Sequence, residues 1–271
     1  MKDEAFDSFL GQKSPIESQL FATFSSESKL VIFDIGACEG EDSIRYSRLF
    51  PEARIFTFEP LPSNRALIQY HFKRHHATRC ELIPLALSDR AGYADFFVSS
   101  GAPDEKVLGE DWNYGNKSNS LLPPGEAQSH QIPWLKYETK IVVQTETLET
   151  FCKSRNLEQV DFIHMDVQGA EWLVLQGASN MLPKITAIWL EVANEQVYKG
   201  QKVGNEIESF LRKKGFKVTY ELLRGVEGDQ FYVNTELRNV WARVVLNRMS
   251  RLGRKCRTFL QRVKADIIPS S

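Results

Sequence analysis

Short apolar segments alternate with amphipathic segments along most of this chain, and this order constrains the fold more than any other feature. Helical patterns follow the apolar segments, at 41–50, 62–76, 146–157, 170–182 and 205–215. Such alternation predicts parallel βαβ units with right-handed crossovers, in an α/β sheet that has helices on both faces. The core strands are predicted at 29–36, 53–60, 80–89, 160–169 and 185–194, with two final pairing strands at 216–222 and 228–234.

The turn after the first strand indicates which ligand this sheet binds. It reads Asp34-x-Gly36-x-x-x-Gly40, which is not the G-x-G-x-x-G spacing of dinucleotide sites. Glu39, Glu41 and Asp42 add negative charge, which disfavours a pyrophosphate at the start of the next helix. A cationic sulfonium nucleoside, S-adenosylmethionine, meets the same turn favourably. A merely structural tight turn, with acids at a helix N-terminus, is the simpler alternative.

Ligands of open α/β sheets bind beyond the carboxyl ends of the strands. Glu59 ends the second strand and is placed to accept hydrogen bonds from both ribose hydroxyls. An acid at this distance is shared with dinucleotide sites, so an NAD-dependent oxidoreductase remains an alternative. The strand-end residues are Asp34, Glu59, Leu87, Asp166 and Glu191.

Several segments in this order resemble class I S-adenosylmethionine-dependent methyltransferases, and among them the FkbM family. They are FDIGACEGEDS, IFTFEPLPSN, LIPLALSDRAG, SNSLL, VQTETLETF and DFIHMDVQGAEWLVLQGA. The resemblance covers about residues 30–234 and implies a Rossmann-like, seven-stranded, mostly parallel sheet whose final strand is antiparallel. It also implies methyl transfer, usually to a hydroxyl of a sugar or secondary metabolite. The candidate cofactor contacts are Asp34, Gly36, Ala37, Gly40, Glu59, Pro60, Ala86, Leu87 and Asp166.

The candidate catalytic residues are Asp166, His164 and Glu191. Asp166 is the first choice to orient an alcohol acceptor or to assist its deprotonation. His164 lies two residues earlier on the same strand face, so it is a second candidate base, with a buried structural histidine as the alternative. Family members commonly have Lys at position 164 and Glu at position 168, where this chain has His164 and Gln168. These departures put the proton acceptor in doubt and leave open a cofactor-binding module without turnover.

The irregular segment 100–138 mixes aromatic and hydrogen-bonding residues, as a lid over a polar acceptor would, although a surface loop can have the same composition. Glu171, in the first turn of a helix, is a further candidate that the resemblance favours. Mg²⁺ held by oxygen atoms of Asp166, Glu191 and Asn194 is an alternative, but two separated acids are weak evidence for it, so no metal site is predicted. His71 and His75 are predicted to lie on a solvated helix face. The candidate acceptor-binding residues are Ser118, Asn119, Ser120 and Glu171.

Charge and composition limit the partners. The formal net charge is −1, so nucleic acid is not an expected partner of the whole molecule, and the four cysteines have no metal-ligand spacing. The first residues lack a basic signal region, and no apolar run reaches about 18 residues, so a cytoplasmic protein is expected. Residues 238–264 carry nine basic residues and no acid. They predict a basic amphipathic helix that packs on the domain, lies on an anionic membrane, or contacts a partner.

These patterns predict an S-adenosylmethionine-dependent O-methyltransferase with a small polar acceptor, a carbohydrate or a glycolipid-type molecule. Three parts of the chain are expected: a helical segment at 1–28, the methyltransferase domain at 29–234, and the basic extension at 235–271. A non-catalytic cofactor-binding or membrane-docking module is the alternative from another class. The sequence makes no prediction about oligomeric state.

Overall fold

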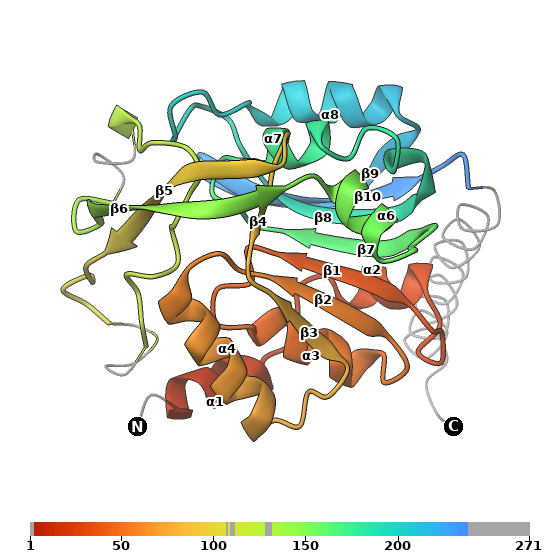
Figure 1. Ribbon diagram of the computed structural model, residues 1–271, viewed down its shortest axis with the longest axis horizontal. Coiled ribbons are helices and arrows are strands. Elements are labelled where there is room, and N and C mark those ends of the chain that lie inside the picture. Colours follow the sequence, from red (N-terminus) through yellow and green to blue (C-terminus); the bar gives the residue numbers. More distant parts are fainter. Residues whose placement is uncertain (1–2, 107, 109–111, 128–131, 238–271) are drawn as a thin grey trace, which may run out of the picture.

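A computed structural model describes residues 3–106, 108, 112–127 and 132–237. Its main sheet has seven strands in the order β3-β2-β1-β7-β8-β10-β9. All neighbours from β3 to β8 are parallel, whereas β10 is antiparallel to both β8 and β9, as the sequence predicted (Figure 1). The strands are β1 (Val31–Ile35), β2 (Arg54–Phe58), β3 (Cys80–Ile83), β7 (Val160–Met165), β8 (Ile185–Ala193), β9 (Phe216–Arg224) and β10 (Glu227–Asn234).

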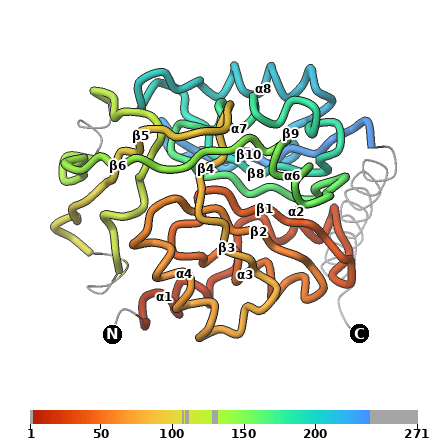
Figure 2. The backbone as a smooth tube through the Cα atoms, viewed as in Figure 1, coloured from red at the N-terminus to blue at the C-terminus, as the bar shows by residue number. Residues whose placement is uncertain are grey.

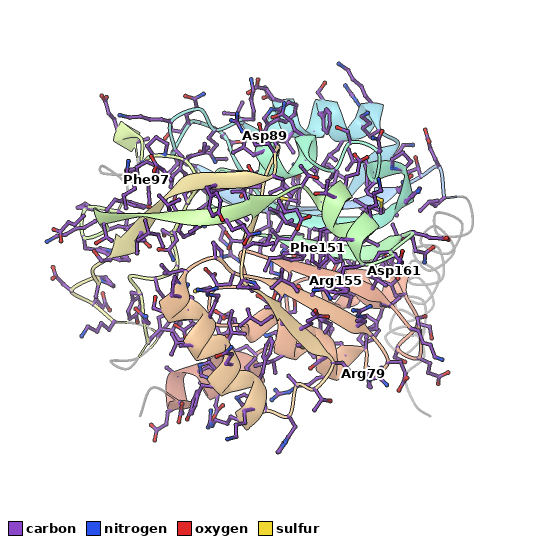
Figure 3. All side chains as sticks on the ribbon, viewed as in Figure 1. Arg79, Asp89, Phe97, Phe151, Arg155 and Asp161 are labelled. Atoms are coloured by element: carbon purple, nitrogen blue, oxygen red, sulfur yellow. The ribbon has the colours of Figure 1, made fainter. Side chains whose placement is uncertain are left out.

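Helices cover both faces of the main sheet, because alternate strand residues are apolar on each side. One buried cluster joins the sheet to the helices that follow β6, β7 and β8. Phe151 lies over this face (Figure 3), where its ring contacts Phe33, Phe56 and Phe58. The helices are α1 (Asp3–Gly11), α2 (Glu17–Thr23), α3 (Glu41–Leu49), α4 (Pro62–Arg74), α6 (Leu148–Ser154), α7 (Glu171–Gln176), α8 (Gly204–Lys213) and the 3-10 turn η1 (Leu182–Lys184).

A second cluster on the opposite face includes the leading segment. Ile16 and Leu20 are fully buried there with Ile32 of β1 and Tyr46 of α3. The segment 1–28, predicted to be helical, therefore contains two short helices, α1 and α2, and their buried residues pack against the sheet domain.

Pro84 divides the predicted third strand between two sheets. β3 ends at Ile83, and the Leu85 amide donates to the Ile83 carbonyl (2.9 Å) across a turn centred on the proline. The chain then enters a three-stranded sheet in the order β4-β6-β5, which the sequence did not predict as a separate unit. Proline has no N–H for the ladder, so a strand crosses between sheets there at low cost. The strands are β4 (Ala86–Leu87), β5 (Gly92–Ser100) and β6 (Lys136–Glu146).

The helix predicted over 170–182 is only six residues long and ends at Gln176. Gly177 lies directly against another backbone segment, where an added Cβ would be 2.0 Å from the Ser88 carbonyl oxygen. Only a residue without a side chain fits this contact, and a short 3-10 turn completes the connection to β8. The predicted helix at 205–215 is confirmed, and Gly215 follows it with φ +89°.

The connection between β5 and β6 lies on the side of the main sheet to which the arrows of the parallel strands point (Figure 1), and its course can be followed in Figure 2. Among the residues that the structure describes, no helix has both the length and the apolar character needed to cross a bilayer. The basic segment 238–264 lies outside the described residues.

Candidate functional site

A pocket of about 480 Å³, counting the part that is open to solvent, lies at the carboxyl ends of β1, β2 and β7. Four residues of the 101–135 connection form one side of it. Six predicted cofactor contacts lie in its wall, and Asn119 is the one predicted acceptor contact that does so. The lining residues are Ile35, Gly36, Cys38, Phe58, Glu59, Pro60, Leu85, Ala86, Leu87, Phe96, Asn116, Lys117, Asn119, Leu121, Asp166, Val167 and Gln168.

Backbone contacts hold the first turn against the neighbouring strands. The amides of Gly36 and Ala37 both donate to the Phe58 carbonyl (3.1 Å each). Gly36 has φ +84°, and a Cβ there would lie 1.9 Å from the Asp166 carbonyl oxygen. Gly40 has φ +83° and faces Phe72 and Ile68 of α4, so it shapes the start of α3 without lining the pocket. The two glycines thus allow the turn to pass close to two neighbouring segments.

Replacing Gly36 by alanine should lower the free energy of unfolding by about 3 kcal/mol or more, because strain at positive φ adds to a backbone clash. Urea denaturation measures this. Gly11→Ala is the matched control, since a Cβ at Gly11 meets nothing within 4 Å, and its change should stay within about 0.5 kcal/mol. Equal stability of the two variants would contradict the described turn.

Glu59 is held rigidly at the end of β2. Its Oε2 accepts from the Cys38 amide (3.0 Å) and its Oε1 accepts from the Leu61 amide (2.8 Å). Burial raises the pKa of Glu59 to about 7, although these N–H groups and Asn64 favour the ionised form. A carboxylate has about four lone-pair positions, so the two backbone contacts leave acceptor capacity for a ligand.

Asp34 does not line the pocket. It is buried beneath the turn and accepts from the Ser43 hydroxyl (2.5 Å), which also contacts the Thr57 hydroxyl (2.7 Å). Burial raises the pKa of Asp34 to about 7. Asp34 was predicted to contact the cofactor directly. In the structure its hydrogen bond with Ser43 connects α3 to β1 instead.

The acids of the turn are largely balanced by the chain itself, which corrects the electrostatic premise from the sequence. The Lys117 ammonium lies 2.8 Å from Glu41 and 3.8 Å from Glu39, and 4.4 Å from the centre of the Trp112 ring. Burial opposes a charge on Lys117, but the two acids raise its pKa overall. Arg45 pairs with Asp42 (3.1 Å). Negative charge at this turn therefore excludes a phosphate less strongly than the sequence suggested.

Asp166 lies at the end of β7 and is exposed in the pocket. Its Oδ1 accepts from Gln168 Nε2 (2.7 Å), which also donates to Glu191 Oε2 (3.1 Å). Tyr198 fixes the orientation of this amide by donating to Gln168 Oε1 (2.8 Å). Desolvation raises the pKa of both Asp166 and Glu191, and the charge of Asp166 raises that of Glu191 further. The Gln168 amide thus bridges Asp166 and Glu191, the two carboxylates among the predicted catalytic residues.

His164 lies deeper on β7, outside the pocket wall. Its Nδ1 is 3.0 Å from the Tyr46 hydroxyl, 3.8 Å from Asp34 and 3.9 Å from Asp42. Burial lowers the pKa of His164, but the surrounding carboxylates outweigh this and raise it. The geometry matches the buried structural histidine better than the second candidate base.

Three other predicted acceptor contacts have structural partners. Glu171 is buried and its Oε1 accepts from the amides of Val167 (3.1 Å) and Gly169 (3.3 Å), so it fixes the turn after β7. Ser120 is also buried and donates to the Gln168 carbonyl (2.7 Å). Ser118 accepts from Tyr137 through its carbonyl (2.9 Å). These residues hold the pocket wall without lining it.

The described residues contain no group of three or more His, Cys, Asp or Glu side chains arranged to hold a metal ion. The solvated helix face predicted for His71 is wrong. Its ring is buried and stacks on Phe6 of α1 (3.6 Å between centroids), because the leading helix packs against α4. His71 Nε2 lies 3.7 Å from Glu39 and so belongs to the support of the first turn.

The doubly wound sheet, with a pocket of mixed apolar and polar lining at its strand ends, defines a Rossmann-like domain. Residues 34–218 match the family described as the methyltransferase FkbM domain. The chain belongs to this family.

Two curated relatives and one solved structure illustrate the similarity. The chain is 36% identical over 207 residues to the 2-O-methyltransferase NoeI of Sinorhizobium fredii, a match that covers 76% of this chain and 80% of that protein. It is 26% identical to Methyltransferase 1 of Beauveria bassiana, with 74% and 76% covered. The N-terminal domain of EvdMO1 with SAH bound aligns with a TM-score of 0.45 at 12% identity, covering 83% of this chain and 82% of that chain.

Proposed function

We propose that this protein transfers a methyl group from S-adenosylmethionine to a hydroxyl of a sugar or another small polar acceptor. The observation that carries the proposal is that Glu59 and Asp166, from the ends of two different strands, line one pocket. The family supports the reaction class. The relative NoeI, a 2-O-methyltransferase by name, supports oxygen as the methylated atom.

The residues present fit a sulfonium nucleoside. Gly36 keeps the turn open where any side chain would collide with the Asp166 backbone, and Glu59 offers acceptor capacity for a ribose diol. Pro60, Ala86 and Leu87 form an apolar part of the pocket wall, which suits an adenine ring. When bound, S-adenosylmethionine supplies the electrophilic methyl group.

The chain's own contribution to the chemistry is to orient the acceptor and to take its proton. Gln168 engages Asp166 Oδ1, and no hydrogen bond to Oδ2 occurs among the described residues. That oxygen is our candidate to accept the acceptor's hydroxyl proton. Burial raises the pKa of Asp166 and so makes it a stronger base than an ordinary aspartate. Mg²⁺ is not part of this proposal.

We propose residues 29–234 as the catalytic domain and residues 1–28 as a helical segment that completes its core. The role of 235–271 as a basic extension that contacts a membrane or a partner stays a prediction, as does a cytoplasmic location. Flotation with anionic liposomes, comparing the full chain with a chain ending at Asn234, tests the membrane role. Equal behaviour of the two would exclude it.

The pH dependence of cofactor-product binding tests the role of Glu59. Because the pKa of Glu59 is about 7 and a carboxylate accepts ribose hydroxyls better than its neutral form, affinity for S-adenosylhomocysteine should rise with pH and level off above about 7. Below that pH, binding should release a proton, which calorimetry in buffers of different ionisation enthalpy detects. Glu59→Gln should lose this proton release. The same release in the variant would contradict the assignment.

Product detection on an acceptor panel tests the proposed activity. Incubation with S-adenosylmethionine and sugars that carry free hydroxyls, amines or neither should yield S-adenosylhomocysteine with the hydroxyl set. Methylation of the amine set alone would contradict O-methylation. Cofactor binding with no turnover on any acceptor would favour the non-catalytic module.

A further inference from the structure

Asn116 is a buried pocket residue whose amide is only half satisfied. It comes from the connection between β5 and β6 and is 7% exposed. Its Nδ2 donates to Glu39 Oε1 (2.9 Å) and to Asn64 Oδ1 (3.0 Å). Its Oδ1 is buried and has no hydrogen-bond partner among the described residues. A buried acceptor without a donor is costly, so such a group needs an explanation.

The neighbours of Asn116 fix the direction of this amide. Turning it over would place Oδ1 against Glu39 Oε1, which is an acceptor only. Glu39 is held ionised because His71, Lys117 and Asn116 itself outweigh the effect of burial and lower its pKa to about 2. The amide donors therefore face the first turn, and the unpaired oxygen is the part left to meet a donor from a ligand.

The position of Asn116 in the pocket indicates which part of a bound ligand its side chain would contact. Its backbone carbonyl lies 3.4 Å from Cys38 Sγ, and the amide of Cys38 donates to Glu59. Asn64, which contacts Asn116, also contributes a hydrogen bond that favours ionised Glu59. Asn116 thus contacts Glu39 through its Nδ2 and lies on the side of the pocket formed by Glu59, the acid assigned to the ribose.

We infer that Asn116 is a cofactor-binding residue whose Oδ1 accepts a hydrogen bond from one hydroxyl of the ribose diol, while Glu59 accepts from the other. The inference rests on the proposed function, because the ribose belongs to S-adenosylmethionine. It gives the 112–121 part of the connection a second role, since this segment binds the cofactor in addition to covering the pocket. The sequence motif at 118–120 lies beside this residue but does not include it.

A cycle of ligand and protein changes tests the inference. S-adenosylhomocysteine and its 2′-deoxy and 3′-deoxy forms are titrated by calorimetry into the wild-type protein and into Asn116→Ala. One of the two analogues should lose about tenfold more affinity for the wild type than for the variant, because the variant has no Oδ1 to leave unpaired. Equal losses in both proteins, for both analogues, would overturn the inference.

Asn119→Ala is the matched control variant. Asn119 lines the same pocket from the same segment, but its Oδ1 accepts from the Ser99 amide (2.9 Å) and its Nδ2 donates to the Asn116 carbonyl (2.7 Å). Its loss loosens the segment without removing the unpaired acceptor, so the affinity ratios of the analogues should stay those of the wild type. The wild-type titration also separates the two proposals. Failure to bind S-adenosylhomocysteine would remove the proposed function, whereas binding without coupling to Asn116 would remove only this inference.

Discussion

Replacing Glu59 by alanine should reduce the affinity for S-adenosylhomocysteine by about a hundredfold or more. A hydroxyl hydrogen bond to a charged acceptor contributes about 1.5–3 kcal/mol, which is a factor of about ten to a hundred in affinity. The substitution also removes the acceptor for the amides of Cys38 and Leu61, which hold the first turn in place. Isothermal titration calorimetry measures the change.

Two variants separate the binding effect from a general loss of structure. Glu59→Gln keeps one carbonyl acceptor and should show an intermediate loss, with a melting temperature closer to that of the wild type. Glu81→Ala removes a partly buried acid of the adjacent strand β3 that does not line the pocket, and its affinity should be unchanged. If Glu59→Ala bound as tightly as Glu81→Ala, Glu59 would not be a cofactor contact.

The Asp166→Asn substitution should lower kcat by about 10²–10⁴-fold and leave the affinity for S-adenosylhomocysteine within about threefold. Asparagine keeps the carbonyl oxygen that Gln168 contacts, so the pocket should keep its shape. It lacks the basic oxygen that takes the acceptor's proton. Single-turnover kinetics at saturating cofactor measures the chemical step apart from binding.

Asp229→Asn controls for the change in charge. Asp229 of β10 lies opposite Glu191 of β8 in the antiparallel register, and its charge raises the pKa of Glu191. The side chain of Asp229 does not line the pocket. Its kcat should remain within about threefold of the wild-type value. Comparable losses in the two variants would assign the effect to local charge and remove Asp166 as the base.

The main sheet was predictable because its signal is local. Each core strand is a short apolar run, and the rule that ligands bind at carboxyl ends selected Glu59 and Asp166 before any contact was known. Pro84 was visible as a fault in a strand. The transfer of the chain to a second sheet after Pro84 was not predictable, because the partner strand β6 lies far along the chain and no local pattern indicates that pairing.

The pocket wall was predicted less well because it depends on long-range contacts. Lys117 and Asn116 meet the acids of the first turn from a segment more than seventy residues away, so sequence reasoning saw the acids as unbalanced. Glu171 and Ser120 lie within matching motifs, yet both are buried as supports of the turn after β7. A motif gives the residues that a site needs, but not which of them touch the ligand.

The most direct test of the central claim is a pair of calorimetric titrations of the full chain, one with S-adenosylhomocysteine and one with NAD. The pocket described by Gly36, Glu59 and Asp166 predicts saturable one-to-one binding of S-adenosylhomocysteine and no binding heat with NAD. Saturable binding of NAD together with no response to S-adenosylhomocysteine would contradict the assignment of this pocket.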